Sequence, residues 1–268
     1  MSCSALGRRL VACLLNISEA RRRDLVETVA RSAITDTHGN KREGITVLNI
    51  FNDVDYNRSV ITIVASIDLI REAVLSACER ACSLIDMNVH EGIHPCMGAV
   101  DLVPLYPLGE EVGLDDCGKE AHGVGASPYV MNCNVTIDTR DLALGRIVAS
   151  AIRESSPGGI PGVQVMALPH EGDVEIACNV ESVQGGPPLS SSNGEEKWPS
   201  FTIGGQIFCH APASLITARV AELSRHHGVG IKGTALVGFT PRECQRLAER
   251  ALSNGTGEFW KELHRVHM

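Results

Sequence analysis

The chain has 268 residues, of which 44% are hydrophobic and 21% are charged, as in a globular protein of one large domain or about two smaller ones. Aromatic residues make up only 4% of the chain, so few rings are present to stack on nucleic-acid bases. The formal net charge of −8 disfavours general binding to nucleic acids or anionic membranes, and we expect neither as a partner.

An apolar run over residues 10–15 follows Arg8 and Arg9 but is shorter than a signal-peptide core of about 7–15 residues. Polar residues follow the run directly, and no stretch reaches the roughly 18 apolar residues of a membrane span. The ten cysteines contain no C-x-x-C pair, and most lie in apolar segments, which predicts buried, reduced thiols. These features predict a cytoplasmic protein.

The first half of the chain shows hydrophobic patterns in the order βαββαβ. Apolar and β-branched runs predict strands over 10–16, 45–51, 59–65 and 99–106. Apolar residues at helical spacing predict a helix that begins after Ser18, its candidate N-cap, and runs to Ile34. The same spacing predicts a second, longer helix over 67–85.

The second half repeats this order. Strands are expected over 129–137, 163–168, 174–183 and 235–239, with a turn at Glu171-Gly172. Helices are expected from Thr139 to Ile152, over 212–226, and from Thr240 to about Leu252. Thr240, Pro241 and Glu243 form the capping-box pattern of a helix start.

Two βαββαβ units predict an α/β fold of the α+β sandwich kind, with two ferredoxin-like subdomains in tandem. We place them at 1–109 and 128–268, separated by a shortened junction at 110–127, with a mobile insertion over 184–200 that is rich in Gly, Pro and Ser. In the junction a helix that begins near Asp115 meets Gly123 after barely two turns.

The densest group of reactive side chains lies over residues 90–98. His90, Glu91 and His94 match the H-E-x-x-H pattern of zinc hydrolases, which requires both imidazoles on one face of a helix. Gly92 and Pro95 disfavour that helix, so the zinc hydrolase remains a remote alternative and no metal is expected.

A rigid loop that presents His94 as a general base is the other interpretation of this segment. An unperturbed imidazole has a pKa of about 6.5, which suits proton transfer at neutral pH. His90 suits a helix C-terminus instead, where it interacts with the dipole. Cys96 carries no sign of a lowered thiol pKa and is expected to be a small buried residue.

Residues 86–101 resemble the D-M-x-x-H-x-G-x-H-P-R-M-G-A-x-D segment of the formiminotransferase domain, best known as the N-terminal half of formiminotransferase-cyclodeaminase. Residues 16–19 resemble the family's N-x-S-E-G segment, and Asn57-Arg58 resembles its N-R pair. The resemblance runs from about Leu10 to Gly109 and resumes, more diffusely, from about Gly125 to Leu252. It implies two ferredoxin-like subdomains.

The resemblance implies a transferase that moves a formimino group from N-formimino-L-glutamate to tetrahydrofolate, the co-substrate, with His94 as general base. Candidate residues for binding folate or the second substrate are Asn16, Asn57, Arg58, His90, Gly98 and Asp101. Positive side chains suited to steering carboxylates are Arg58, Arg140, Arg146, Arg219 and Lys232.

The chain departs from the family pattern at three residues and lacks two of its parts. Ala20 replaces a glycine, Cys96 replaces a basic residue, and Glu91 stands where the mammalian enzyme has a lysine. Several dozen residues of the family are missing between Gly109 and Gly125, and the cyclodeaminase half is absent. The missing residues supply cover and an edge strand in the family, so the resemblance implies an exposed edge on the first sheet and association into a homodimer. A non-catalytic relative that binds folate or forms dimers is therefore the alternative to an active formiminotransferase.

Overall fold

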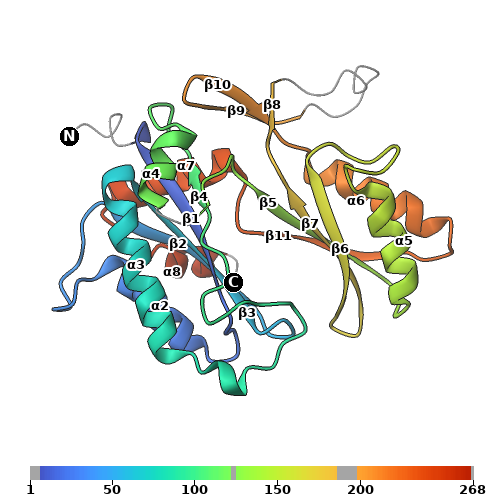
Figure 1. The fold of residues 1–268 in the computed structure, drawn as a ribbon, viewed down its shortest axis with the longest axis horizontal. Helices are drawn as coiled ribbons and strands as arrows, with labels where there is room; N and C mark the ends of the chain where they lie inside the picture. Colours follow the sequence, from blue (N-terminus) through green and yellow to red (C-terminus); the bar gives the residue numbers. More distant parts are fainter. Residues whose placement is uncertain (1–6, 122–124, 186–197, 267–268) are drawn as a thin grey trace. The chain divides into compact units, whose positions relative to one another are not determined.

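The computed structural model describes residues 7–121, 125–185 and 198–266, which form two compact units (Figure 1). Unit 1 holds the described residues up to 127 together with 203–205 and 240–266, and unit 2 holds 128–202 and 206–239. Each unit combines an antiparallel four-stranded sheet with helices that pack on it. The predicted α+β sandwich class is therefore confirmed.

Unit 1 is built on a sheet with the strand order β2-β3-β1-β4. Its strands are β1 (Leu10–Ile17), β2 (Ile45–Asp53), β3 (Arg58–Ser66) and β4 (Leu105–Pro107). Its helices are α2 (Arg23–Ile34), α3 (Ile67–Leu84), the 3-10 turn η1 (Met87–Val89), α4 (Leu114–Ala121), α7 (Pro241–Ser253) and α8 (Trp260–Val266).

Helices α2 and α3 pack against each other and against the sheet (Figure 1). Buried residues of α2 recur at helical spacing, from Val26 through Val29 and Ala30 to Ala33, and place one apolar face on the core. The short helix α4 also packs on α3 and β4, and its Cys117 is fully buried. The segment after Gly109 therefore covers part of this core.

Two predicted boundaries in unit 1 are wrong. Helix α2 begins at Arg23, and Ser18 is no N-cap, because its hydroxyl donates to the carbonyl of Gly98 at 2.7 Å. The strand predicted over 99–106 is reduced to Leu105–Pro107. The residues before it lie beside the end of β1 but form only isolated contacts with it. The Asp101 peptide donates to the Asn16 carbonyl, and Ile17 forms a single β-bridge with Val100.

The C-terminal segment packs on the first sheet, although the sequence placed it in the second subdomain. Helices α7 and α8 contact β2, and the peptide of Val47 donates to the carbonyl of Gly257 at 2.8 Å. At the other edge, Leu105 of β4 bonds to Gly125. Both edge strands thus have backbone partners, and the expectation of an exposed edge is corrected at these positions.

Unit 2 has the sheet order β11-β5-β7-β6, so each sheet places its fourth strand first, followed by its first, third and second. The strands are β5 (Met131–Ile137), β6 (Val163–His170), β7 (Asp173–Val180) and β11 (Ile231–Val237), and the helices are α5 (Leu142–Ile152) and α6 (Ala213–Arg225). Both helices contact the sheet. Helix α5 begins at Leu142 and not at the expected Thr139, and Asp141 caps it by accepting from two backbone N–H groups.

The turn between β6 and β7 lies where it was predicted. Glu171 and Gly172 have φ angles of 48° and 84°, and the hairpin has only these two loop residues. A separate small sheet contains β8 (Val183–Gln184), β10 (Gln206–Cys209) and β9 (Ser200–Ile203). Most of the predicted insertion, residues 186–197, lies outside the described residues, whereas Trp198 is buried in the core of unit 2.

Within the described ranges, no helix combines the length and the apolar character needed to cross a membrane. The described cysteines form no disulfides. Cys13 and Cys178 are buried as expected, but Cys82 is exposed. Burial raises the pKa of the Cys13 thiol well above its ordinary value, which keeps this sulfur protonated and unreactive.

Candidate active site

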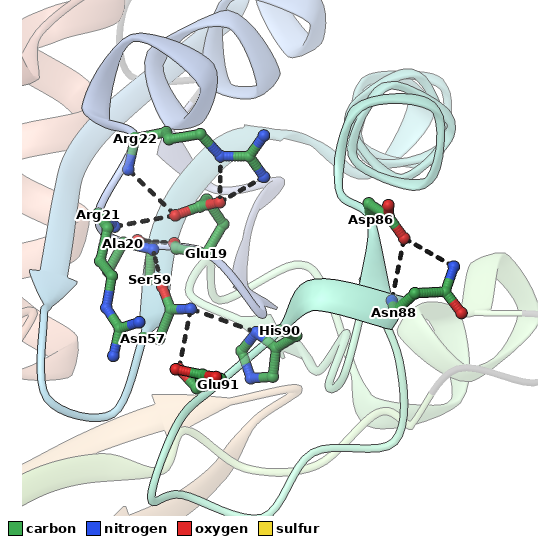
Figure 2. A network of polar contacts seen from close by, with 10 residues as sticks. All are labelled: Glu19, Ala20, Arg21, Arg22, Asn57, Ser59, Asp86, Asn88, His90 and Glu91. Atoms are coloured by element: carbon green, nitrogen blue, oxygen red, sulfur yellow. Dashed lines mark hydrogen bonds and ion pairs between the residues drawn. The ribbon is translucent and has the colours of Figure 1, made fainter.

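Three segments of unit 1 meet at the candidate site. They are the end of β1, the turn between β2 and β3, and the stretch after η1, residues 90–98, which we call the reactive loop. Figure 2 shows how their polar groups connect. Asn57 is central, because its side-chain oxygen accepts from the Ala20 peptide at 3.0 Å while its amide donates to the Glu91 carbonyl at 3.1 Å. The same amide lies 3.3 Å from Nδ1 of His90. One buried side chain therefore joins all three segments.

The segment before α2 is held by the buried carboxylate of Glu19. It accepts from the peptides of Arg21 and Arg22 at 2.9 and 3.0 Å, and from Nε of Arg22 at 2.6 Å (Figure 2). Burial opposes ionisation of Glu19, but these hydrogen bonds and the Arg22 charge outweigh it, so the pKa of Glu19 is lowered. The hydroxyl of Ser59 donates to the Glu19 carbonyl and anchors the segment to β3.

The backbone at the β2–β3 turn requires particular residues. Asn57 has a φ of 49°, a left-handed conformation that asparagine tolerates better than most residues. Gly92 passes so close to this turn that a Cβ added to it would lie 2.3 Å from the Tyr56 carbonyl oxygen. The glycine therefore allows the reactive loop to lie against the hairpin.

His94 lies beside an ion pair between Arg58 and Asp101. The two side chains are 11% and 6% exposed, and Nη1 of Arg58 contacts Oδ2 of Asp101. Nε of Arg58 donates to Oδ1 of Asn16 at 3.1 Å, and the Met97 peptide donates to Oδ1 of Asp101 at 2.9 Å. The guanidinium is thus held from two sides, with its Nη1 3.4 Å from Nδ1 of His94.

The imidazole of His94 is half-buried and has two further neighbours. Its Nδ1 lies 2.7 Å from the Pro95 carbonyl oxygen, and the Tyr56 ring meets it edge-on with centroids 5.4 Å apart. Burial, followed by the charge of Arg58, lowers the pKa of His94 below its ordinary value, against the opposing effects of the Pro95 carbonyl, Asp101 and Asp53. The ring is therefore unprotonated at neutral pH, as a general base must be.

The segment that carries His94, residues 89–102, also exposes several apolar side chains. Exposed fractions reach 72% for Val89 and 79% for Met97, while Ile93 and Leu102 are about half exposed. Cys96 in the same loop is also exposed, which corrects the expectation that it is buried. A loop that exposes this much apolar surface beside charged groups suits a ligand with both an aromatic and a polar part.

The structure brings most of the predicted site residues together in unit 1. Arg58 lies beside His94 and is bonded to Asn16 and Asp101, while Asn57 holds the His90–Glu91 stretch. Gly98 contributes its carbonyl, which accepts from Ser18. The remaining candidate cations, Arg140, Arg146, Arg219 and Lys232, belong to unit 2. Three of them have partners there: Arg140 bonds to Gly172, Arg219 pairs with Glu222, and Lys232 pairs with Asp173.

The zinc-hydrolase alternative loses its geometric premise. Residues 90–94 form no helix, so His90 and His94 are not presented from one helical face. Among the residues for which the structure gives a position, no group of three or more His, Cys, Asp or Glu side chains is arranged to hold a metal ion.

Two contributors to the site were missed in the sequence. Tyr56 packs its ring on His94, although only its neighbour Asn57 was selected. Glu19 organises the loop before α2, whereas Ser18 was selected there as a cap. Glu19 had a signal in the sequence, because it lies in the segment 16–19 that resembles the family's N-x-S-E-G pattern. Tyr56 had only its position beside Asn57, which does not indicate a site without the fold.

Comparison with known proteins finds a family match that covers the N-terminal part of unit 1, including the loop that carries His94, and extends through β5 of unit 2. Residues 10–137 match the family model described as formiminotransferase domain, N-terminal subdomain. The formimidoyltransferase-cyclodeaminase of Gallus gallus is 36% identical over 117 residues, which cover 44% of this chain and 20% of that protein. The chain therefore spans about a fifth of the length of this bifunctional relative.

A relative of more similar length is the glutamate formimidoyltransferase of Thermoplasma acidophilum. It is 26% identical over 245 residues, which cover 66% of this chain and 78% of the relative. The formiminotransferase cyclodeaminase-like protein of Arabidopsis thaliana is 24% identical over 253 residues, with 65% and 83% covered. Each alignment is longer than the part of this chain that it covers, which is about two thirds of 268 residues. The difference consists of gaps, as expected when a relative carries residues that have no counterpart in this chain.

Proposed function

We propose that this chain, whose residues 10–137 match the N-terminal subdomain of the formiminotransferase domain, is a folate-dependent formiminotransferase with His94 as its general base. The observation that supports it is the setting of His94, a half-buried imidazole held neutral beside Arg58 in the segment that matches the family. The names of the relatives, glutamate formimidoyltransferase among them, support the reaction class.

The proposed reaction joins N5 of tetrahydrofolate to the formimino carbon of N-formimino-L-glutamate. As that bond forms, N5 becomes cationic, and its proton passes to the neutral imidazole of His94. Collapse of the tetrahedral intermediate breaks the bond between the formimino carbon and the glutamate nitrogen, which takes the proton back from His94. The exposed apolar side chains around the loop suit the aromatic part of folate, and Arg58 suits a carboxylate or developing charge.

The direct test follows formimino transfer from formiminoglutamate to tetrahydrofolate by the intact chain and by His94→Ala. The variant is expected to lose about 10²–10⁴-fold in kcat, the usual contribution of a general base. His38→Ala is the matched control, because His38 is an exposed histidine of the same unit that lies in another loop. A rate that survives His94→Ala contradicts the proposal.

The pH profile supplies a second readout. Because the pKa of His94 is lowered in the unliganded chain, the base is available down to a more acidic pH than for an ordinary histidine. The acid limb of kcat/KM against pH, which reports the free enzyme, is therefore expected below about 6.5, the ordinary value. A limb above that pH argues against His94 as the base.

The second candidate is a non-catalytic relative that binds folate or forms dimers. Cys96 and Glu91, which replace basic residues of the family pattern, and the segment missing after Gly109 favour it. It predicts binding of tetrahydrofolate without a His94-dependent rate, so the transfer assay combined with a binding titration separates the two candidates.

The homodimer and the cytoplasmic location remain predictions. The original argument for a dimer was an exposed edge of the first sheet, and the backbone partners of both edge strands in unit 1 weaken it. Light scattering on the purified chain tests it: a dimeric mass supports the prediction, and a monodisperse monomer contradicts it.

A further inference from the structure

Nδ1 of His94 lies near both a hydrogen-bond acceptor and a hydrogen-bond donor, and it can pair with only one of them. A carbonyl oxygen only accepts, so the 2.7 Å contact with Pro95 requires a hydrogen on Nδ1. A guanidinium only donates, so the 3.4 Å contact with Arg58 requires a lone pair on the same atom. One ring nitrogen cannot satisfy both, and the outcome decides which nitrogen of the neutral imidazole is able to accept a proton.

The nearest neighbours of Arg58 favour Pro95 in this competition. Asp101 takes a hydrogen of Nη1, the same nitrogen that faces His94, and Asn16 takes the hydrogen of Nε. The Pro95 contact is shorter, at 2.7 Å against 3.4 Å, and a donor that is already bonded to a buried carboxylate has little to gain from a long bond to imidazole. The guanidinium then acts on His94 as a nearby charge and not as a hydrogen-bond donor.

We infer that Asp101 is a positioning residue for the proposed base: by binding Arg58 it keeps the hydrogen of His94 on Nδ1, bonded to Pro95, and leaves Nε2 to accept the proton. This inference rests on the proposed function for its role in transfer, while the tautomer itself is a property of the unliganded chain. Loss of Asp101 lets Arg58 donate to Nδ1, moves the hydrogen to Nε2, and removes the lone pair that the reaction needs.

The isosteric variant Asp101→Asn isolates this effect. Asparagine keeps an oxygen for the Met97 peptide, which donates to Oδ1 at 2.9 Å in the native chain, but it turns a donor toward Arg58. Asp101→Glu restores the carboxylate and is the conservative control. The double variant Arg58→Gln/Asp101→Asn removes the competing donor charge together with its partner.

The other charged groups around the ring respond differently. Arg58 from β3, Asp101 from the following loop and Asp53 at the end of β2 act on His94 electrostatically, and the Tyr56 ring packs on it. Arg58→Gln alone removes a positive charge, so it is expected to raise the pKa of His94 and to leave its hydrogen on Nδ1. A change of tautomer is therefore distinct from a change of pKa.

The experiment is ¹⁵N NMR of the histidine side chains in the folded, intact chain, with His94→Ala used to assign the signal. Above its pKa, His94 is expected to show a protonated Nδ1 and an unprotonated Nε2 in the native chain, with the pattern reversed in Asp101→Asn and restored in the double variant. Kinetics are expected to follow: Asp101→Asn loses at least tenfold in kcat with little change in KM, since general-base catalysis contributes about 10²–10⁴-fold.

A hydrogen on Nε2 in the native chain overturns the inference, and so does an Asp101→Asn spectrum that keeps the native pattern. Failure to restore Nδ1–H in the double variant also overturns it, because a merely structural role of Asp101 is not rescued by removing Arg58. The stated NMR pattern in a chain that transfers no formimino group supports the tautomer assignment and refutes the proposed function, so the two failures are distinguishable.

Discussion

The sheets of the two units share a strand order but differ in how their faces are covered. In β1 nearly every residue is buried, and Leu10, Ala12 and Leu14 on one face are as inaccessible as Val11, Cys13 and Leu15 on the other. In β5 burial alternates: Met131, Cys133, Val135 and Ile137 are buried, and Asn132, Asn134 and Thr136 between them are partly exposed.

The polar face of unit 2 satisfies its groups within the sheet. The Asn132 amide donates to Asn179 at 2.6 Å, and the Asn134 amide donates to the buried carboxylate of Glu175 at 3.0 Å. Unit 1 carries few polar side chains along β1. The residues directly after the loop that carries His94 are bonded through their backbone to the end of this strand. The same topology thus supports a sheet buried on both sides, which anchors the reactive loop, and a sheet with one polar face.

The largest expected difference comes from shortening one side chain in the first strand of each sheet. Leu14→Ala removes a side chain that is 3% exposed and is expected to cost about 2–5 kcal/mol of unfolding free energy. Thr136→Ala on the partly exposed face of β5 is expected to cost less than about 1 kcal/mol. Urea unfolding measures the free energy of unfolding of both variants. Equal losses would contradict the conclusion that β1 is buried on both faces and β5 on only one.

Glycines provide a second contrast. Gly92→Ala places a methyl group 2.3 Å from the Tyr56 carbonyl oxygen, so the reactive loop must move. We expect a stability loss of about 1–3 kcal/mol and, if the proposed function holds, a kcat loss of about a hundredfold. Gly233→Ala in β11 has no heavy atom within 4 Å and serves as the control. Near-native kcat in Gly92→Ala would show that this close approach is dispensable.

The buried carboxylate of Glu19 sharpens the comparison through pH. Its pKa is lowered in the folded chain, so its stabilising effect is complete above its unfolded value and is lost as pH falls through the folded value. Glu19→Gln is expected to cost about 1–2 kcal/mol at neutral pH and progressively less below about pH 4.5, the ordinary value. Unfolding curves of both proteins from pH 7 to pH 3 test this, and a constant gap at every pH would refute it.

Helix caps give the smallest effect and test the assignment of α7 to unit 1. Thr240→Ala and Asp141→Ala each remove a side-chain oxygen that accepts from helix-start peptides, at a cost of about 1 kcal/mol. Hydrogen exchange is expected to rise in β2 for the first variant and in β6 for the second, since α7 packs on β2 and α5 packs on β6. Faster exchange in β11 after Thr240→Ala would instead place α7 with unit 2.

Much of this organisation follows from the sequence alone. The apolar run of β1, the alternation in β5, the turn at Glu171-Gly172 and the cap at Thr240 are local patterns, because side-chain period, φ preference and capping chemistry involve only neighbouring residues. His94 was identified for a related reason: its segment is contiguous and matches a family motif within the region that the family model covers.

Only the tertiary structure decided what surrounds that histidine and what covers the first sheet. Arg58 and Asp101 are 43 residues apart in the chain, and Tyr56 packs on His94 from the turn between β2 and β3. The edge strand β2 has its backbone partner at Gly257. Ser18 has the composition of a helix cap but bonds to Gly98, eighty residues away. Such contacts depend on which strands lie next to each other. Hydrophobic period and secondary-structure propensity do not contain that information, so the surroundings of His94 could be determined only from the tertiary structure.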